Sequence, residues 1–358
     1  MERLRASAFR CYSRVEIEFV DGVTAIVGPN GAGKTSLLEA VHFGCLGWSP
    51  RTTDEARLVA DGEQLTRVEV SVVAQGRATE VAVGFRPGQP KRVTVDGTRP
   101  ASLDALTPRF PILVFTPDRL AVVKGAPATR RAYFDRAATR RWPAAATTSR
   151  DFTRALSQRN HLLRRVRAGV ADASALDPWD DAVATTGAAL SDLRARLVDL
   201  LEPAFAARLE SLGGGPASPA LAYRPHGPVD AEGLRELLRR RRRPDIERAL
   251  TGAGPQHDDI VFAEARDVRA YGSQGEQRSA LLALVLAEAD TLTEARGERP
   301  LLLLDDVASE LDRERRARLL TALAAPGQTL LTTTQQDDLA ASVSHTIGVR
   351  RGRLVEAT

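Results

Sequence analysis

The sequence is poor in lysine, cysteine and aromatic side chains, and it has no long hydrophobic run. Only Cys11 and Cys45 are cysteines, and their spacing is not that of metal ligands, so we expect two reduced thiols rather than a disulfide framework. No stretch approaches the roughly 18 apolar residues of a membrane span, and no apolar segment follows Arg3 and Arg5 to form a secretion signal. We therefore expect a cytoplasmic protein that is not inserted in a membrane.

The scarcity of lysine makes one lysine conspicuous. Of the 50 basic residues only Lys34, Lys91 and Lys124 are lysines. Lys34 stands in a glycine-rich stretch between an apolar run, Val23–Val27, and an amphipathic segment, Leu37–Leu46. This strand–loop–helix context is that of a phosphate-binding loop, which requires a compact ammonium where the rest of this chain uses arginine.

The phosphate loop predicts a nucleoside triphosphate site. Gly28 and Gly33 allow the backbone N–H groups to converge on the phosphates. We expect Lys34 to contact the β- and γ-phosphates and the Thr35 hydroxyl to bind Mg²⁺. The residues predicted to bind the nucleotide from this stretch are Gly28, Pro29, Asn30, Gly31, Ala32, Gly33, Lys34, Thr35 and Ser36.

Hydrophobic patterning divides the chain into three parts. Alternating runs predict strands in the first part, with an antiparallel sheet formed by residues 68–73, 79–85 and 92–95. Helical spacing dominates from about Arg130 to Leu212, and a further helix over Ala231–Arg243 is expected to end at Pro244. Strand patterns then return. The predicted domains are residues 1–115 and 255–358, which form one α/β core, and an inserted helical arm, residues 116–254.

A second candidate element is a strand that ends in two carboxylates. The run Leu301–Leu304 is typical of a buried parallel strand, and Asp305 and Asp306 follow it. In an open α/β sheet, ligands lie beyond the carboxyl ends of the strands, where the phosphate loop also lies. We expect Asp305 to hold Mg²⁺ together with Thr35, and Asp306 to orient the water that attacks the γ-phosphate. Asp306 and Lys34 are the predicted catalytic residues.

A third candidate element is the turn that precedes an apolar helix, residues 273–278. A helix N-terminus binds anions, but the phosphate loop already surrounds the triphosphate of its own chain. A symmetric dimer resolves this redundancy, because each protomer then offers the turn to the γ-phosphate of the other. An ordinary helix cap is the alternative. The residues predicted to bind the nucleotide across this interface are Ser273, Gly275, Gln277 and Asp312.

The order of these motifs resembles the ABC-type ATPases of the SMC kind. Three further stretches resemble the RecF family: Phe9–Tyr12, Pro117–Asp135 and Gly254–Asp259. The resemblance covers the whole chain, without a long coiled coil. It implies an ABC-type P-loop ATPase core, with a mixed sheet, helices and an antiparallel β subdomain, and an inserted α-helical arm. It also implies that the nucleotide is ATP and that Arg10 contacts it.

The same resemblance implies a function in recombinational DNA repair and replication-fork maintenance. A RecF-like protein dimerises with ATP on DNA at single-strand gaps and, with RecR and RecO, helps load RecA. Three residues depart from the usual ABC pattern: Thr116 replaces a Gln, Asp306 replaces a Glu and Thr334 replaces a His. These departures predict a weak, DNA-stimulated ATPase.

Arginines concentrate between residues 139 and 168, where Asp151 is the one acidic residue. Such a run on helices can track DNA phosphates, and an aromatic content of only 5% favours duplex backbone contacts over base stacking. A solvated face of an arginine-rich protein is the alternative, and it applies more strongly to Arg239–Arg243. The predicted DNA-binding residues are Arg140, Arg141, Arg159, Arg164, Arg165 and Arg167.

Two other functions remain open at this point. The first is the ATP-binding head of another SMC-like complex, such as one that serves a nuclease; the sequence has no Cys-x-x-Cys hook between its ATPase halves. The second is the ATP-binding subunit of a transporter, which the large helical insertion and its arginines disfavour.

Overall fold

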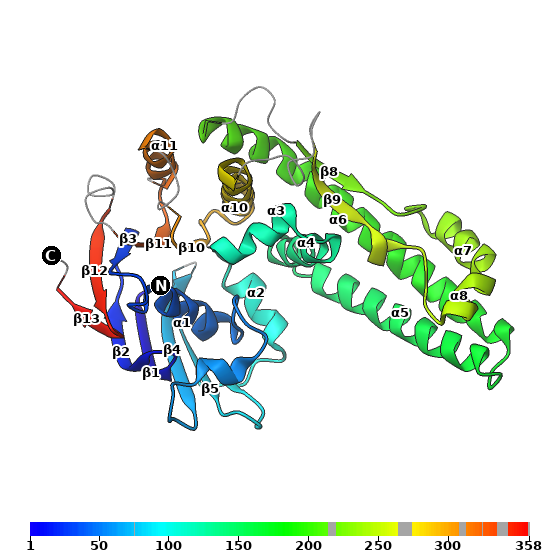
Figure 1. Ribbon diagram of the computed structural model, residues 1–358, viewed down its shortest axis with the longest axis horizontal. Helices are drawn as coiled ribbons and strands as arrows, with labels where there is room; N and C mark the ends of the chain where they lie inside the picture. The colour runs from blue at the N-terminus through cyan, green and yellow to red at the C-terminus, as the bar shows by residue number, and fades with distance from the viewer. Residues whose placement is uncertain are drawn as a thin grey trace. The chain divides into compact units, whose positions relative to one another are not determined.

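The computed structural model describes residues 1–74, 76–213, 220–263, 274–307, 313–323, 325–334 and 343–356. These residues form two compact units, each visible in Figure 1. The first unit comprises Met1–Leu120, Arg208–Gly214 and Leu281–Thr358, and the second comprises Ala121–Ala207 and Gly215–Ala280. The second unit therefore reaches further along the chain than the predicted arm, residues 116–254.

The first unit contains an antiparallel sheet of five strands in the order β2-β1-β4-β5-β6. Its strands alternate, as the sequence pattern predicts: Leu4 and Ala6 are buried, whereas Arg5 between them is exposed. The predicted antiparallel pairing is confirmed. The strands are β1 (Arg3–Phe9), β2 (Tyr12–Glu18), β4 (Thr66–Ala74), β5 (Arg77–Phe85) and β6 (Arg92–Val95).

The second sheet of this unit has six strands in the order β13-β12-β3-β11-β10-β7. The strands from β12 to β7 are parallel, and β13 adds an antiparallel edge. Because β3 and β7 come from the first third of the chain and the others from its end, this sheet combines strands from both ends of the chain. The strands are β3 (Gly22–Val27), β7 (Ile112–Phe115), β10 (Leu301–Leu304), β11 (Gln328–Thr333), β12 (His345–Arg350) and β13 (Arg353–Val355).

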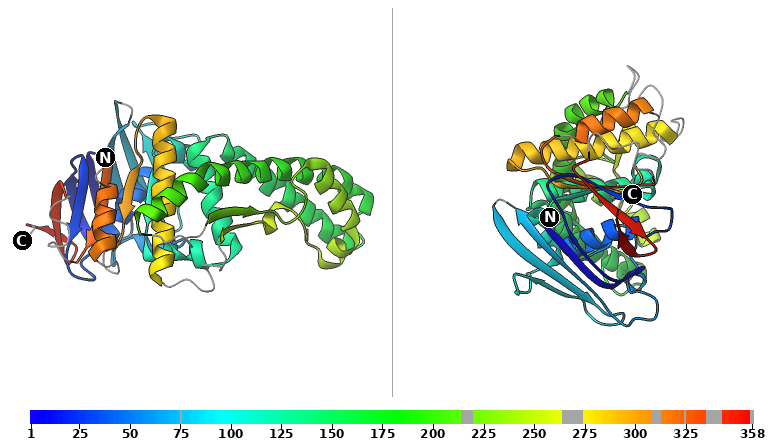
Figure 2. Two further views of the ribbon diagram at one scale, coloured as in Figure 1. Left: turned by 90° about the horizontal axis from the view of Figure 1, so that it is seen from above. Right: turned by 90° about the vertical axis from the view of Figure 1, so that its left-hand side faces the viewer.

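Helix α1 (Lys34–Leu46) lies between the two sheets (Figure 1). Nearly every side of this helix is buried, because it packs in a hydrophobic core to which both sheets contribute. The helix is therefore apolar on nearly every side. On the opposite face of the six-stranded sheet lie α11 (Arg313–Leu323) and the part of α10 (Gln274–Arg296) that begins at Leu281 (Figures 1 and 2). The short helices are η1 (Glu55–Leu58), η2 (Leu103–Ala105), α2 (Leu106–Arg109) and η3 (Pro117–Leu120).

The second unit consists mainly of helices and a β-hairpin. Strands β8 (Ala220–Arg224) and β9 (Asp259–Ala263) pair antiparallel, so the predicted helical arm contains a strand, β8, that the sequence pattern missed. The helices are α3 (Ala121–Lys124), α4 (Pro127–Arg141), α5 (Ala145–Arg167), η4 (Ala173–Leu176), α6 (Asp177–Ser211), α7 (Ala231–Arg240), α8 (Arg242–Arg248) and η5 (Pro255–His257).

One predicted boundary is wrong. Pro244 was expected to end the helix that starts at Ala231, but α7 ends at Arg240 and Pro244 lies in the first turn of α8. Proline is tolerated there because the first N–H groups of a helix have no partner within it.

Candidate functional site

The phosphate loop connects β3 to α1, as predicted. Gly31 and Gly33 have φ of 77° and 115°, a region that favours glycine. A Cβ on Gly28 would lie 2.1 Å from the Val349 carbonyl oxygen, and one on Gly33 would lie 2.8 Å from the Tyr12 hydroxyl. Glycine is therefore required at both positions for a steric reason as well as for phosphate access.

Lys34 is 8% exposed, and it is surrounded by neutral partners. Its Nζ donates to the carbonyl oxygens of Gly28 (2.7 Å) and Pro29 (3.1 Å), and it makes no ion pair with any described residue. Burial lowers the pKa of this ammonium from its ordinary value, and the carboxylates of Asp306 and Asp305 oppose the shift. A buried cation that no carboxylate contacts directly is costly, so this position is suited to an anionic ligand.

The two predicted magnesium ligands lie together. Strand β11 lies between β3 and β10, so the ends of these three strands bring Thr35 and Asp305 into contact. The Thr35 hydroxyl is 2.9 Å from both carboxylate oxygens of Asp305, which is 6% exposed. Burial raises the pKa of Asp305, and hydrogen bonds from Thr332 and Thr35 oppose that shift. A hydroxyl and a carboxylate are oxygen ligands of the kind that Mg²⁺ prefers, so these residues fit the ion.

Asp306 follows with an unusual backbone. Its φ is 51°, in the left-handed region, where aspartate occurs more readily than most residues. Its N–H donates to the hydroxyl of Thr332 (2.9 Å), which in turn donates to Asp305 Oδ1 (2.7 Å). Sequence reasoning missed Thr332, because a threonine inside a β-branched strand has no distinctive pattern.

Arg10 lies in the turn between β1 and β2, and its φ is also positive, at 52°. Its guanidinium forms a bidentate ion pair with Glu39, at 2.8 and 2.7 Å, and donates to the Arg57 carbonyl. The Glu39 side chain is fully buried and also accepts from Ser49 and Arg51. The predicted contact of Arg10 with ATP stays a prediction.

The residues of the predicted dimer interface are described only in part. Gly275 and Gln277 lie in the first turn of α10, and Gln277 is 8% exposed. Ser273 and Asp312 lie outside the described residues.

Two of the predicted DNA contacts are wrong. Arg159 is fully buried and pairs with Asp180 (2.7 Å) and Asp245 (2.8 Å). Arg140 is only 7% exposed and lies over the Tyr133 ring. A sequence signal existed for Arg159, since it follows Phe152 and Ala155 at helical spacing and so shares the inward stripe of α5.

The other arginines of α5 named below differ from Arg159 in their exposure and in their ion pairing. Arg164, Arg165 and Arg167 are exposed, as is Arg154, and none of the four forms an ion pair within the described parts of the chain. Arg141, also a predicted DNA contact, is half-buried with its guanidinium 5.3 Å from the centre of the Trp142 ring.

The second arginine cluster is neutralised by carboxylates. Each member of Arg239–Arg243 has an acidic partner within 4.0 Å. Arg239 pairs with Asp181, Arg240 with Glu236, Arg241 with Asp245, Arg242 with both Asp177 and Asp180, and Arg243 with Glu247. This pairing favours the solvated, structural interpretation of that cluster.

Two of the three stretches that resemble the RecF family meet inside the second unit. Arg130 forms a bidentate pair with Asp259, at 2.7 Å for both bonds, and the Arg131 side chain donates to the Asp258 carbonyl. Asp135 accepts two hydrogen bonds from Arg194, which also reaches Asp258. These motif residues therefore connect α4 to β9 and α6.

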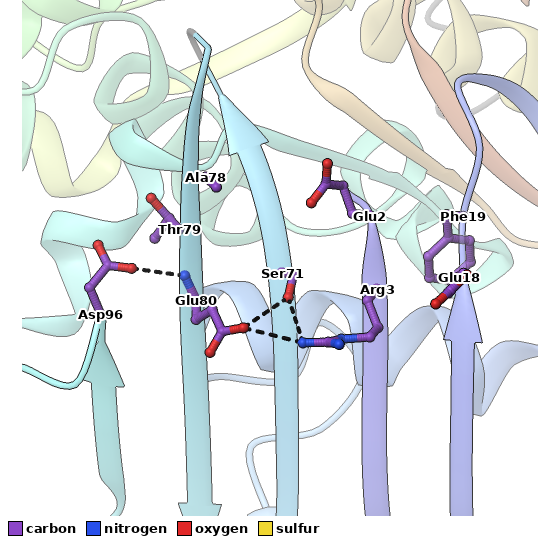
Figure 3. A pocket seen from close by; sticks show the side chains of 9 residues that line it. All are labelled: Glu2, Arg3, Glu18, Phe19, Ser71, Ala78, Thr79, Glu80 and Asp96. Atoms are coloured by element: carbon purple, nitrogen blue, oxygen red, sulfur yellow. Dashed lines mark hydrogen bonds and ion pairs between the residues drawn. The ribbon is translucent and has the colours of Figure 1, made fainter.

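A pocket of about 520 Å³ opens on the first unit, away from the residues described above (Figure 3). Arg3 bridges Ser71 and Glu80 there, and an Asp96 oxygen accepts from the Glu80 N–H. No residue of the phosphate loop, and neither Asp305 nor Asp306, lines it.

The comparisons with known proteins agree with this geometry. A family model described as the RecF/RecN/SMC N terminal domain matches residues 1–355. The DNA replication and repair protein RecF of Myxococcus xanthus is 40% identical over 343 residues, covering 92% of this chain and 90% of its own length. That of Moorella thermoacetica is 36% identical over 357 residues, covering 99% and 95%.

Solved structures give the same result. The recombination mediator protein RecF of the RecFOR pathway, solved with ATP, has a TM-score of 0.90 at 26% identity and covers 100% of this chain and 97% of its own. The SMC head domain of Pyrococcus furiosus has a TM-score of 0.58 at 17% identity over 99% of this chain and 95% of its own, and it shows the fold alone. The predicted fold class is thereby confirmed. In the part of the chain that the structure describes, no helix is long and apolar enough to cross a membrane.

Proposed function

The chain belongs to the RecF family, and from this premise we propose that it is a cytoplasmic, ATP-dependent mediator of recombinational DNA repair and replication. It binds Mg²⁺·ATP at the phosphate loop and dimerises on DNA at single-strand gaps. With RecR and RecO it helps load RecA. The name of the relative solved with ATP, a recombination mediator of the RecFOR pathway, supports this proposal.

The observation that carries the proposal is the buried ammonium of Lys34 at the mouth of the phosphate loop. Its hydrogen-bond partners are two carbonyl oxygens, and no carboxylate of the described residues forms an ion pair with it, although Asp306 and Asp305 act on it electrostatically. The triphosphate of ATP supplies a counter-ion through charge-assisted hydrogen bonds. Bound Mg²⁺ would be held by Thr35 and Asp305 and would neutralise charge that develops on the phosphates during hydrolysis.

Hydrolysis is proposed to be slow. Asp306 carries its carboxylate one methylene closer to the backbone than the glutamate of most ABC ATPases. The positions of the usual glutamine and histidine are occupied by Thr116 and Thr334, which cannot position water in the same way. ATP binding rather than turnover then controls the dimer.

The dimer is proposed to complete each ATP site in trans. The turn Ser273–Arg278 of one protomer meets the γ-phosphate held by the Lys34 of the other, and Asp312 lies at the same interface. Exposed arginines of α5 then contact the DNA backbone.

Light scattering tests the central claim. We expect a monomer without nucleotide, a dimer with Mg²⁺·ATP, and a larger mass when a short gapped duplex is added. A chain that stays monomeric with ATP and gapped DNA, under conditions in which calorimetry shows ATP bound, would contradict the proposed function.

A mixing experiment tests the trans arrangement. Ser273→Arg places a long cation where the turn must meet the partner's phosphate, so ATP should bind while dimerisation and hydrolysis fail together. Lys34→Met should fail to bind ATP. A mixture of the two variants contains one intact composite site per heterodimer, so partial ATPase activity should return. If Ser273→Arg alone dimerises normally, the turn is an ordinary helix cap.

A further inference from the structure

We propose that Thr332 is a positioning residue, whose hydroxyl fixes both Asp305 and Asp306 in the geometry that Mg²⁺·ATP requires. The inference rests on the proposed function, because it assigns a role in the same ATP site. Thr332 lies in β11. This strand lies between β3, which precedes the phosphate loop, and β10, which precedes Asp305 and Asp306.

The position of Thr332 allows it to reach both acidic residues. It lies near the end of β11, opposite Ile26 of β3, while its neighbour Leu331 is opposite Leu304 of β10. Its side chain is fully buried. It therefore occupies the middle of the three strand ends that build the site, with no access to solvent.

A single hydroxyl makes both contacts. Its proton is donated to Asp305 Oδ1 at 2.7 Å, and its oxygen accepts the N–H of Asp306 at 2.9 Å. A hydroxyl has one proton to donate and can accept a second bond, so this arrangement uses both of its capacities. A valine of the same shape would leave the Asp306 N–H without this acceptor and remove a donor from Asp305.

The bond to Asp306 holds a backbone that few residues adopt. With φ at 51°, the Asp306 carboxylate projects in a direction that an ordinary strand or helix conformation would not give. Such conformations persist where the surroundings over-determine them, and they are concentrated at functional sites. The hydrogen bond to Thr332 is one such determinant.

The bond to Asp305 leaves its other oxygen for the metal. Without an ion, the Thr35 hydroxyl lies 2.9 Å from both oxygens of Asp305. If the Thr35 oxygen ligated Mg²⁺ in place of this contact, the hydrogen bond from Thr332 to Oδ1 would keep the carboxylate oriented. Outer-shell partners of this kind commonly contribute about 10–100-fold to metal affinity.

Thr332→Val tests the hydroxyl without changing the shape of the strand. Thr24→Val is the matched control: Thr24 lies in the adjacent strand β3, is fully buried, and its hydroxyl has no hydrogen-bond partner among the described residues. Calorimetry measures ATP affinity in EDTA and then across a Mg²⁺ titration, and thermal unfolding measures stability.

For Thr332→Val we expect the Mg²⁺ concentration at half-saturation to rise by about tenfold or more, while ATP affinity in EDTA stays within about twofold. Thr332→Ser should restore the wild-type Mg²⁺ dependence, and Thr24→Val should leave it unchanged. If valine prevents folding, Thr332→Ala, which is smaller, gives the same comparison with Thr332→Ser.

Two outcomes would overturn the inference: an unchanged Mg²⁺ dependence in Thr332→Val, or an equal shift in Thr24→Val. Either leaves the proposed function intact, provided that the wild-type protein binds Mg²⁺·ATP. A wild-type protein that binds no ATP would instead contradict the proposed function itself.

Discussion

The two units of this protein bury basic side chains in opposite ways. In the first unit, Lys34 is almost wholly buried among carbonyl oxygens. In the second, Arg159 is fully buried between the carboxylates of Asp180 and Asp245 and donates further to Thr251. Of these two cations, only the second is paired with carboxylates of the described chain. A buried charge that the chain neutralises is structural, whereas one that it leaves without a counter-ion is suited to a ligand.

The same distinction separates two groups of arginines in the second unit. Arg164, Arg165 and Arg167 form no ion pair among the described residues, whereas every member of Arg239–Arg243 has a carboxylate partner. Sequence alone gives both groups the same basic character. Pairing, rather than the number of arginines, therefore selects the group that is available for DNA phosphates.

The largest effect is expected from Arg159→Met, which removes the buried cation between two carboxylates and leaves Asp180 paired with Arg242 alone and Asp245 with Arg241 at 4.0 Å. Breaking a buried pair on one side costs about 3–5 kcal/mol, so the free energy of unfolding should fall by that amount in urea titrations. ATP affinity, measured by calorimetry below the unfolding transition, should stay within about threefold of wild type. A stable Arg159→Met protein that has lost DNA binding would restore Arg159 as a DNA contact.

Lys34→Met should lower the affinity for ATP without lowering the stability of the protein. Hydrogen bonds to charged groups contribute about 1.5–3 kcal/mol each, so ATP affinity should fall by about 100-fold or more. The variant should unfold at the same temperature as wild type or higher, because it removes a buried charge whose burial outweighs the opposing effect of Asp306 and Asp305. ATP binding with near wild-type affinity in calorimetry would show that the phosphate-loop assignment is wrong.

The contrast between Lys34 and Arg159 also shows which features of the site could be predicted from the sequence. The phosphate loop and the strand before Asp305 were predicted because each is a continuous pattern whose chemistry is local. Arg159 and Thr332 depend on partners far away in the chain: Arg159 pairs with Asp245, and Thr332 bridges residues of a neighbouring strand. Counting arginines cannot show which of them meets a carboxylate, although the apolar stripe of α5 does mark Arg159 as inward-facing.

A smaller effect is expected from the exposed arginines of α5. Replacing Arg164, Arg165 and Arg167 with alanine should weaken DNA binding without regard to sequence, since the proposed contacts are with phosphates, which carry no sequence information. A plot of log affinity against log salt should flatten by about 0.9 for each DNA phosphate that the variant no longer neutralises.

The matched control carries the same loss of charge. Replacing Arg239, Arg240 and Arg243 with alanine also removes three arginines, but each of these already has an acidic partner. Its salt slope should equal that of wild type. Equal slopes in all three proteins would place DNA elsewhere, and α5 would then face solvent or a protein partner.

The smallest effect is expected from Arg240→Ala alone. Arg240 pairs with Glu236 at 2.8 Å one helical turn away, with side chains that are 73% and 50% exposed. Exposed pairs of this spacing contribute about 0.3–0.5 kcal/mol, so a double-mutant cycle with Glu236→Ala should give a coupling no larger than that.

Arg165→Ala is the comparison that makes this weak effect informative. Both variants remove one exposed arginine from a helix of the same unit, and they differ in whether a carboxylate partner is present among the described residues. If pairing decides which arginines bind DNA, Arg165→Ala should lower the salt slope by about one unit and Arg240→Ala should not. Equal reductions of DNA affinity would show instead that overall positive charge attracts the DNA, and the ion pairs of the second unit would then carry no information about its binding surface.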